Sequence, residues 1–305
     1  MCTMSKASEI ANNVWMGPTP DSILCRSSIR KVQKPDFDVL IEASDLAQLP
    51  HSDALRRIGE LSDSALQHID FPSSGSIMPP TWSHAEVDGL MEMCRWIYRL
   101  ANPENPADSV EEESDSDGDI PMTTLSQRPR KILIHCTDGY TESTLLGLAY
   151  FMYAECAPVH DAWLRLHCEK KRNFFAYHSD VALLTSIQPR ILRQSPKRPK
   201  DVSKIERDAP AWLSRIDGSL PSRILPYMYL GNLGHANNPE LLKAMGIRRV
   251  LSVGEPVGWS ERDLSSWGRE NMFYVDRVQD NGVDPLTDEF DRCLDFIGMG
   301  LAATA

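Results

Sequence analysis

The sequence predicts an α/β fold followed by a partial second copy of the same arrangement. One stretch carries most of this prediction. The apolar run Lys131–Cys136 is typical of a buried strand, a short loop with one glycine follows, and residues 144–153 form an apolar run long enough for a helix. Further strands and helices alternate along the chain, and a similar opening segment returns at residue 220. Alternating elements of this kind predict helices packed against a central sheet.

The other elements of the first half follow in order. Strands are expected over residues 10–17, 37–41 and 66–69. Ser83 and Glu86 form a capping box, and apolar residues then recur at helical spacing as far as Tyr98, so a helix is predicted from this point. Two more helices are expected over residues 159–166 and 179–188. The basic turn 170–175 lies between them.

The composition narrows the class of protein. The chain has 305 residues, 42% of them hydrophobic and 25% charged, which is typical of a soluble globular protein with room for two domains. Seven cysteines without paired spacing favour free thiols in a reducing compartment, so we expect the cytoplasm or the nucleus. The absence of a Cys-x2-Cys pair argues against zinc. No apolar run is long enough to span a membrane.

The net charge of −11 is concentrated in one segment. Between Arg99 and Arg128 there are eight acidic residues and no Lys or Arg, and the serines among them are candidate phosphorylation sites. Because residues 102–127 have almost no apolar content, we expect a disordered acidic insertion there. The acidic balance argues against a nucleic acid partner.

Cys136 ends the predicted strand and faces the start of the predicted helix. Backbone N–H groups of the loop and of the first helical turn would converge there, and the helix dipole would favour a negative charge. The same environment lowers the pKa of a thiol and produces a nucleophilic thiolate. The pattern therefore indicates anion chemistry at Cys136. A core cysteine in an unrelated α/β domain is the alternative reading.

His135, Cys136, Gly139 and Ser143 stand in the register of His-Cys-x5-Arg-Ser/Thr, the phosphate loop of protein tyrosine and dual-specificity phosphatases. The chain resembles this family, and its organisation is similar to that of the tandem dual-specificity phosphatases of fungi. The resemblance implies a central mixed sheet flanked by helices, dephosphorylation of protein phosphotyrosine, phosphoserine or phosphothreonine without metal or other cofactor, and Cys136 at the nucleophile position. It assigns these residues to the phosphate loop: His135, Thr137, Asp138, Gly139, Tyr140, Thr141, Glu142 and Ser143.

The family's arginine is missing from this loop, and Glu142 occupies its position. In the family that arginine grips two phosphate oxygens. At an effective dielectric constant of about 20, two like unit charges about 4 Å apart repel by roughly 4 kcal/mol. The carboxylate also disfavours the Cys136 thiolate. The family's general acid is missing as well, since Asp70 is displaced from the expected position. We therefore expect impaired catalysis, and a regulatory or protein-binding pseudophosphatase is the alternative function.

The opening segment is repeated 214 residues later, where Met228–Gly231 aligns with Val14–Gly17. Two further strands follow at residues 246–255 and 272–275, and Asp280 falls where the family carries its general acid. A helix is expected over residues 287–297. Cys293 lies inside it with no glycine loop after it, so it does not replace the nucleophile.

We therefore predict a degenerate phosphatase-like domain over residues 1–192 and a basic linker over 193–219. Residues 220–305 are then the N-terminal part of a second domain, truncated before its catalytic loop. The linker is expected to be solvated, with a nuclear import signal or a latch for the acidic insertion as alternatives. The expected partner is a phosphoprotein or another protein, with no membrane involved.

Overall fold

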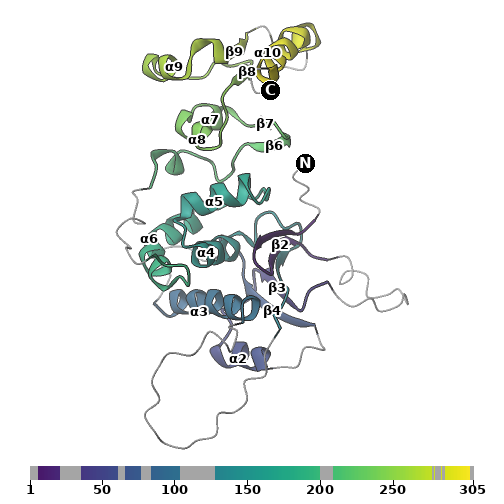
Figure 1. Ribbon diagram of the computed structural model, residues 1–305, viewed down its shortest axis with the longest axis vertical. Helices are drawn as coiled ribbons and strands as arrows, with labels where there is room; N and C mark the ends of the chain where they lie inside the picture. The colour runs from purple at the N-terminus through teal and green to yellow at the C-terminus, as the bar shows by residue number, and fades with distance from the viewer. Residues whose placement is uncertain are drawn as a thin grey trace, which may run out of the picture. The chain divides into compact units, whose positions relative to one another are not determined.

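The computed structural model describes residues 6–20, 36–60, 66–76, 84–103, 128–199, 209–276, 278, 283 and 286–302 (Figure 1). Two compact units make up the chain, and the boundary between them falls between Ala209 and Pro210. Asp280 and nearly all of the acidic insertion lie outside the described residues, as does Ser83 of the expected capping box.

A mixed five-stranded sheet forms the centre of the first unit, in the order β1-β2-β5-β3-β4. Its strands are β1 (Ser8–Ala11), β2 (Val14–Pro18), β3 (Val39–Ser44), β4 (Gln67–Pro72) and β5 (Ile132–Cys136). β1 runs antiparallel to β2, and every other pairing is parallel. All five residues of β5 are buried, as expected of the central strand of a sheet with both faces covered. The predicted fold class is confirmed.

The prediction of one strand over residues 10–17 is wrong, because the chain turns back at Asn12 and Asn13 to form the β1-β2 hairpin. Asn13 has a φ of 56°, a left-handed conformation that asparagine tolerates better than most residues. Its side-chain amide donates to the carbonyl of Ala101 at 3.0 Å. The hairpin turn is thereby tied to the end of a helix that lies far away in sequence.

Five helices complete the described part of the first unit: α2 (Ser52–Glu60), α3 (His84–Ala101), α4 (Thr144–Glu155), α5 (Val159–Cys168) and α6 (His178–Gln194). α4 is buried at every position from Thr144 to Ala154 and packs against α3, α5 and α6, which lie around it in Figure 1. Sequence analysis missed α2, whose one fully buried residue is Leu55. α6 runs past its expected end and through Pro189.

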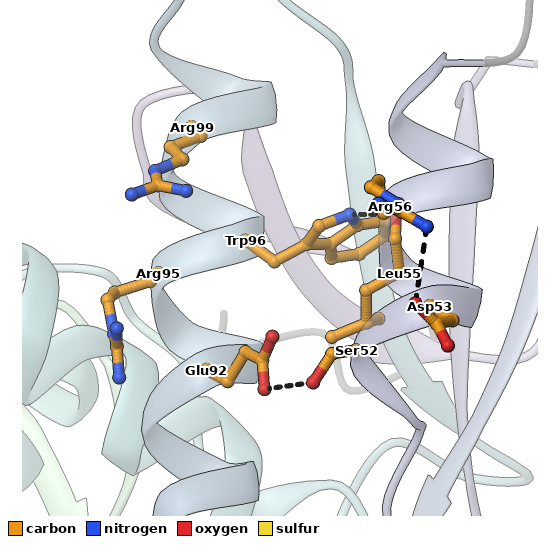
Figure 2. A pocket seen from close by; sticks show the side chains of 8 residues that line it. All are labelled: Ser52, Asp53, Leu55, Arg56, Glu92, Arg95, Trp96 and Arg99. Atoms are coloured by element: carbon orange, nitrogen blue, oxygen red, sulfur yellow. Dashed lines mark hydrogen bonds and ion pairs between the residues drawn. The ribbon is translucent and has the colours of Figure 1, made fainter.

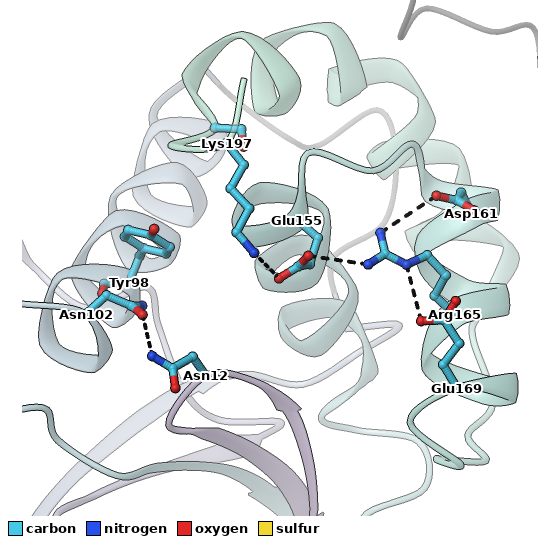
Figure 3. A network of polar contacts seen from close by, with 9 residues as sticks. Asn12, Tyr98, Asn102, Glu155, Asp161, Arg165, Glu169 and Lys197 are labelled. Atoms are coloured by element: carbon cyan, nitrogen blue, oxygen red, sulfur yellow. Dashed lines mark hydrogen bonds and ion pairs between the residues drawn. The ribbon is translucent and has the colours of Figure 1, made fainter. Parts of the chain in front are cut away.

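A network of charged side chains joins α4 to α5 and to the segment that follows α6 (Figure 3). Arg165 on α5 lies 3.3 Å from the carboxylate of Glu155 at the end of α4, which also pairs with Lys197 at 2.7 Å. Asp161 and Glu169, on the same side of α5, approach Arg165 at 3.9 and 3.6 Å. The network fixes the helix that leads into the basic turn 170–175.

The second unit contains two separate two-stranded sheets among its described residues, β6-β7 and β8-β9. The strands are β6 (Ser222–Leu225), β7 (Met228–Leu230), β8 (Val250–Val253) and β9 (Met272–Val275). The helices are α7 (Leu233–Ala236), α8 (Pro239–Ala244), α9 (Glu261–Trp267) and α10 (Phe290–Ala302). Cys293 lies within α10, as expected. Trp212 and Leu213, in the range predicted to be a linker, are buried.

The hairpin of the second unit repeats the hairpin of the first in register. Ser8 pairs with Met16 in the β1-β2 hairpin, and Ser222 pairs with Leu230 in the β6-β7 hairpin, so each partner lies 214 residues further along. In the first unit β5 pairs with both β2 and β3, but the described residues of the second unit place no strand between β7 and β8. Met16 is fully buried in consequence, whereas Leu230 is 65% exposed.

None of the helices in the described ranges is long and apolar enough to cross a membrane.

Candidate active site

The thiol of Cys136 lies at the carboxyl end of β5, where the sequence predicts it. The backbone carbonyl of Cys136 accepts a hydrogen bond from the Thr19 amide at 2.9 Å, which holds the end of β5 against β2. The loop 137–143 then leads directly into the amino-terminal end of α4. Cys136 is 1% exposed. The predicted arrangement of strand, loop and helix is therefore present, and the thiol of Cys136 is buried within it.

An arginine from another part of the chain holds the middle of this loop. Arg172, in the basic turn after α5, is 1% exposed and donates to the carbonyl of Gly139 and, at 2.9 Å, to that of Lys6. The Phe175 amide donates to the carbonyl of Tyr140 at 2.9 Å. Sequence analysis recognised a basic turn here but not its contact with the loop. Because this guanidinium binds one loop carbonyl and the carbonyl of Lys6, it ties the loop to the segment before β1.

Two carboxylates gather beside the Cys136 thiol. Ligand atoms of Cys136, Asp138 and Glu142 all lie within 4.8 Å of one another. Asp138 accepts from the Tyr140 amide at 2.8 Å, and the thiol of Cys136 points to the same carboxylate oxygen at 3.7 Å. Glu142 has one buried oxygen, Oε2, with no hydrogen-bond partner in the part of the chain that the structure describes. Negative charge therefore surrounds the thiol.

These surroundings raise the pKa of the Cys136 thiol above its ordinary value of 9.0. Burial is the largest cause, and the Glu142 carboxylate adds to it by hydrogen bonding and by charge. The Ser143 hydroxyl, 3.4 Å from Sγ, and the Ser143 amide act in the opposite direction but do not reverse the shift. The thiol is accordingly protonated at neutral pH.

The same three side chains are the only described group whose ligand atoms come close enough to hold one metal ion. A thiolate with two carboxylates is a chemically reasonable donor set for a divalent cation. The loop that carries these side chains, however, leads into the amino-terminal end of α4, a helix of 12 residues, where the backbone N–H groups carry partial positive charge. This partial positive charge disfavours a cation beside Cys136.

Comparisons with known proteins identify dual-specificity phosphatases among the relatives of the chain. No family model matches the chain. It is 29% identical to the dual specificity protein phosphatase PPS1 of Saccharomyces cerevisiae over 87% of its own length and 40% of that protein. The dual specificity protein phosphatase 4 of Homo sapiens is 34% identical over 76 residues, which are 20% of this chain and 19% of that protein. The chain is homologous to dual-specificity protein phosphatases. It spans less than half the length of these relatives.

Two solved phosphatase structures align with the chain at low TM-scores and low sequence identity. Tk-PTP in its active form aligns with a TM-score of 0.34 and 19% identity, over 60% of this chain and 97% of its own. The PTP-2 phosphatase of Cydia pomonella aligns with a TM-score of 0.35 and 15% identity, over 60% and 89%.

The segment after β4, where dual-specificity phosphatases are expected to carry the general acid, offers serines in this chain. Ser74 donates its amide to the carbonyl of Glu142 at 2.8 Å, and its hydroxyl accepts from the Leu145 amide at 2.7 Å. Asp70 lies inside β4, exposed and opposite Glu42, and not in the loop that the sequence suggested. This segment therefore supports the loop 137–143 and the start of α4 structurally.

A buried carboxylate holds the same segment from the other side. Asp180, in the first turn of α6, accepts from the Gly75 amide at 3.2 Å and is fully buried. Burial raises its pKa to about 6, and the hydrogen bonds from Gly75 and Ser74 only partly offset this effect. An aspartate in the first turn of a helix is too common to have indicated this contact from the sequence.

His135 lies within the buried strand next to Cys136 and makes a hydrogen bond through Nδ1 to the Thr19 hydroxyl at 3.1 Å. Burial lowers its pKa to about 4, with a further contribution from the charge of His68. The imidazole is therefore neutral at pH 7. Its bond to Thr19 links β5 to the residue that follows β2.

Proposed function

We propose that the first unit is a phosphatase-like domain that keeps its phosphate loop folded but does not hydrolyse phosphoesters. In this proposal it serves as a regulatory or protein-binding module within a dual-specificity phosphatase. The observation that carries it is the position of Glu142: its carboxylate lies with Asp138 beside the Cys136 thiol. Three further arguments support it.

The first argument is electrostatic. A phosphoester in this loop would meet two carboxylates, and residues 137–143 include no Lys or Arg to offset them. At about 4 Å and an effective dielectric constant of about 20, each pair of like unit charges costs roughly 4 kcal/mol. Arg172 does not replace the missing arginine, because its guanidinium is buried and donates to the backbone carbonyls of Gly139 and Lys6.

The second argument is the state of the thiol. A phosphoryl transfer to Cys136 requires the thiolate, and burial together with Glu142 raises the pKa of this thiol. The third argument is the missing proton donor, since Ser73 and Ser74 take the place of an acid after β4 and Asp70 lies within the strand. Each of the three groups that a cysteine-dependent phosphatase uses is therefore altered.

An active phosphatase is the second candidate. Ser143 favours it, because its hydroxyl and amide lower the pKa of the Cys136 thiol from a distance of 3.4 Å. Homology to dual-specificity phosphatases favours it as well. The substrates would then be phosphoproteins, and Asp280, outside the described residues, stays a predicted general acid of the second unit.

Turnover of para-nitrophenyl phosphate separates the two candidates, with Cys136→Ser as the matched control. We expect the wild-type rate to equal that of the variant. Turnover that disappears in Cys136→Ser would overturn the proposal.

The domain organisation belongs to the same proposal: a first domain over residues 1–192, a linker over 193–219 and part of a second phosphatase domain over 220–305. The repeated hairpin supports it. We also propose a cytoplasmic or nuclear setting and a protein or phosphoprotein partner. The cysteines among the described residues support the setting, because all five are free thiols.

A further inference from the structure

A pocket of about 340 Å³ lies between α2 and α3 (Figure 2). Three of its lining side chains are arginines: Arg56 from α2, and Arg95 and Arg99 from α3. Its residues belong to neither the loop 137–143 nor the segment after β4. The pocket is therefore separate from the candidate active site.

Two of these arginines are in no ion pair among the described residues, and the Asp88 carboxylate interacts with Arg95 by charge alone. Arg95 and Arg99 stand four positions apart on α3, and within the described residues neither makes an ion pair or a hydrogen bond. Arg95 has a buried Nε atom that lacks an acceptor. Like charges at this spacing destabilise a helix by a few tenths of a kcal/mol. An anion in the pocket would pair with the terminal guanidinium nitrogens of both arginines and offset this repulsion.

The acidic residues of the pocket have other partners. The Asp53 carboxylate lies 3.3 Å from the guanidinium of Arg56, and Glu92 accepts a hydrogen bond from the Ser52 hydroxyl at 2.8 Å. The dashed lines in Figure 2 mark both contacts, while Arg95 and Arg99 extend from α3 without one. The guanidinium groups of Arg95 and Arg99 thus remain available to a ligand.

An immobilised aromatic ring forms part of the wall between the two helices. Trp96 donates its indole N–H to the carbonyl of Leu55 at 2.7 Å, which fixes the ring against α2. The ring is partly exposed and offers a flat apolar surface beside the arginines. Such a surface suits the aliphatic part of a peptide whose charged group reaches the guanidinium groups.

We propose that this pocket binds the phosphoryl group of a phosphorylated protein segment through Arg95 and Arg99, independently of the Cys136 loop. Guanidinium groups bind phosphate oxygens as a fork, and two of them match the two negative charges of a phosphomonoester. A carboxylate would carry half that charge. The pocket volume also exceeds what a lone phosphate ion fills, which leaves room for neighbouring peptide atoms.

Isothermal titration of the full chain with the peptide Ala-Ala-pSer-Ala-Ala tests the proposal. The unphosphorylated peptide and inorganic phosphate are the comparison ligands. The double variant Arg95→Gln with Arg99→Gln should lower the affinity for the phosphopeptide by about tenfold or more, as expected for the loss of charge-assisted hydrogen bonds. The corresponding double lysine variant keeps both positive charges but not the two-pronged guanidinium geometry. Its affinity for the phosphopeptide should lie between those of the wild type and the double glutamine variant. Arg57→Gln is the control, because Arg57 lies on the neighbouring helix α2 and does not line the pocket.

Unchanged affinity in the double glutamine variant, with its circular dichroism spectrum preserved, would overturn the proposal, because the phosphate would then bind elsewhere. Failure of the wild-type chain to bind the phosphopeptide at millimolar concentration would overturn it as well. Equal affinity for the phosphopeptide and for inorganic phosphate would contradict a protein segment as the ligand. Repeating the titrations with Cys136→Ser, which cannot hydrolyse the phosphopeptide, keeps these results independent of whether the Cys136 loop is active.

Discussion

The Sγ atom of Cys136 lies 3.4 Å from the hydroxyl of Ser143, and both side chains are buried. This contact favours the thiolate, while burial and Glu142 favour the thiol. The loop thus combines a group that activates the cysteine with surroundings that keep it protonated. The balance between them decides whether the first unit has any phosphatase chemistry.

The rate at which iodoacetamide modifies Cys136 should rise with pH around a midpoint above 9, the ordinary pKa of the thiol. Glu142→Gln should lower this midpoint, because it removes a charge that favours the thiol. Ser143→Ala should raise it, because it removes the hydroxyl that stabilises the thiolate. Mass spectrometry of the peptide that carries Cys136 follows the reaction. A wild-type midpoint near 6 would show an activated cysteine and contradict the assignment.

Gly139→Ala should disrupt the loop. Gly139 has a φ of +67°, and an added Cβ atom would lie 2.5 Å from the backbone nitrogen of Pro18 and equally close to Arg172. We expect a loss of about 3 kcal/mol or more, since left-handed strain and a backbone clash add together. Hydrogen exchange of β5 and α4 amides measures it.

Gly246→Ala is the matched control for that substitution. Gly246 has a φ of +74°, and nothing lies within 4 Å of an added Cβ atom, so only the backbone strain of about 1–2 kcal/mol applies. If each substitution lowered the stability of the unit that contains it by the same amount, the contacts of Gly139 with Pro18 and Arg172 would not constrain the loop.

Asp180 should make the first unit less stable as the pH rises. Its pKa is raised from 3.8 to about 6, so the folded state binds more protons than the unfolded state between these values, and stability falls across this window. Asp180→Asn keeps a hydrogen-bond acceptor for Gly75 but cannot titrate. The free energy of unfolding of the variant, relative to wild type, should therefore increase by about 2.4 kcal/mol from pH 4 to pH 7.

Urea unfolding of both proteins at intervals of one pH unit measures this difference. His135, with its pKa lowered to about 4, contributes the opposite slope, but it does so in both proteins and cancels. A difference that stays constant with pH would mean that Asp180 is ionised in the folded state throughout.

Sequence analysis located the strand-loop-helix at Cys136 and the repetition of the opening segment at residue 220, because both depend on local patterns. The apolar run of β5 and the glycine loop after it are contiguous in the chain. The turn at Asn13 was missed because apolar residues flank it on both sides. The contact of Arg172 with Gly139 and that of Asp180 with Gly75 join residues far apart in sequence, and no spacing rule predicts them.

The measurement that tests the central claim most directly is the binding of orthovanadate by the wild-type chain and by Glu142→Arg, with Cys136→Ser as the control in both backgrounds. If the carboxylate of Glu142 keeps oxyanions out of the loop, the wild-type chain binds no vanadate through Cys136, and Glu142→Arg gains an affinity that Cys136→Ser abolishes. Equal, Cys136-dependent binding by the wild-type chain and by Glu142→Arg would contradict the account.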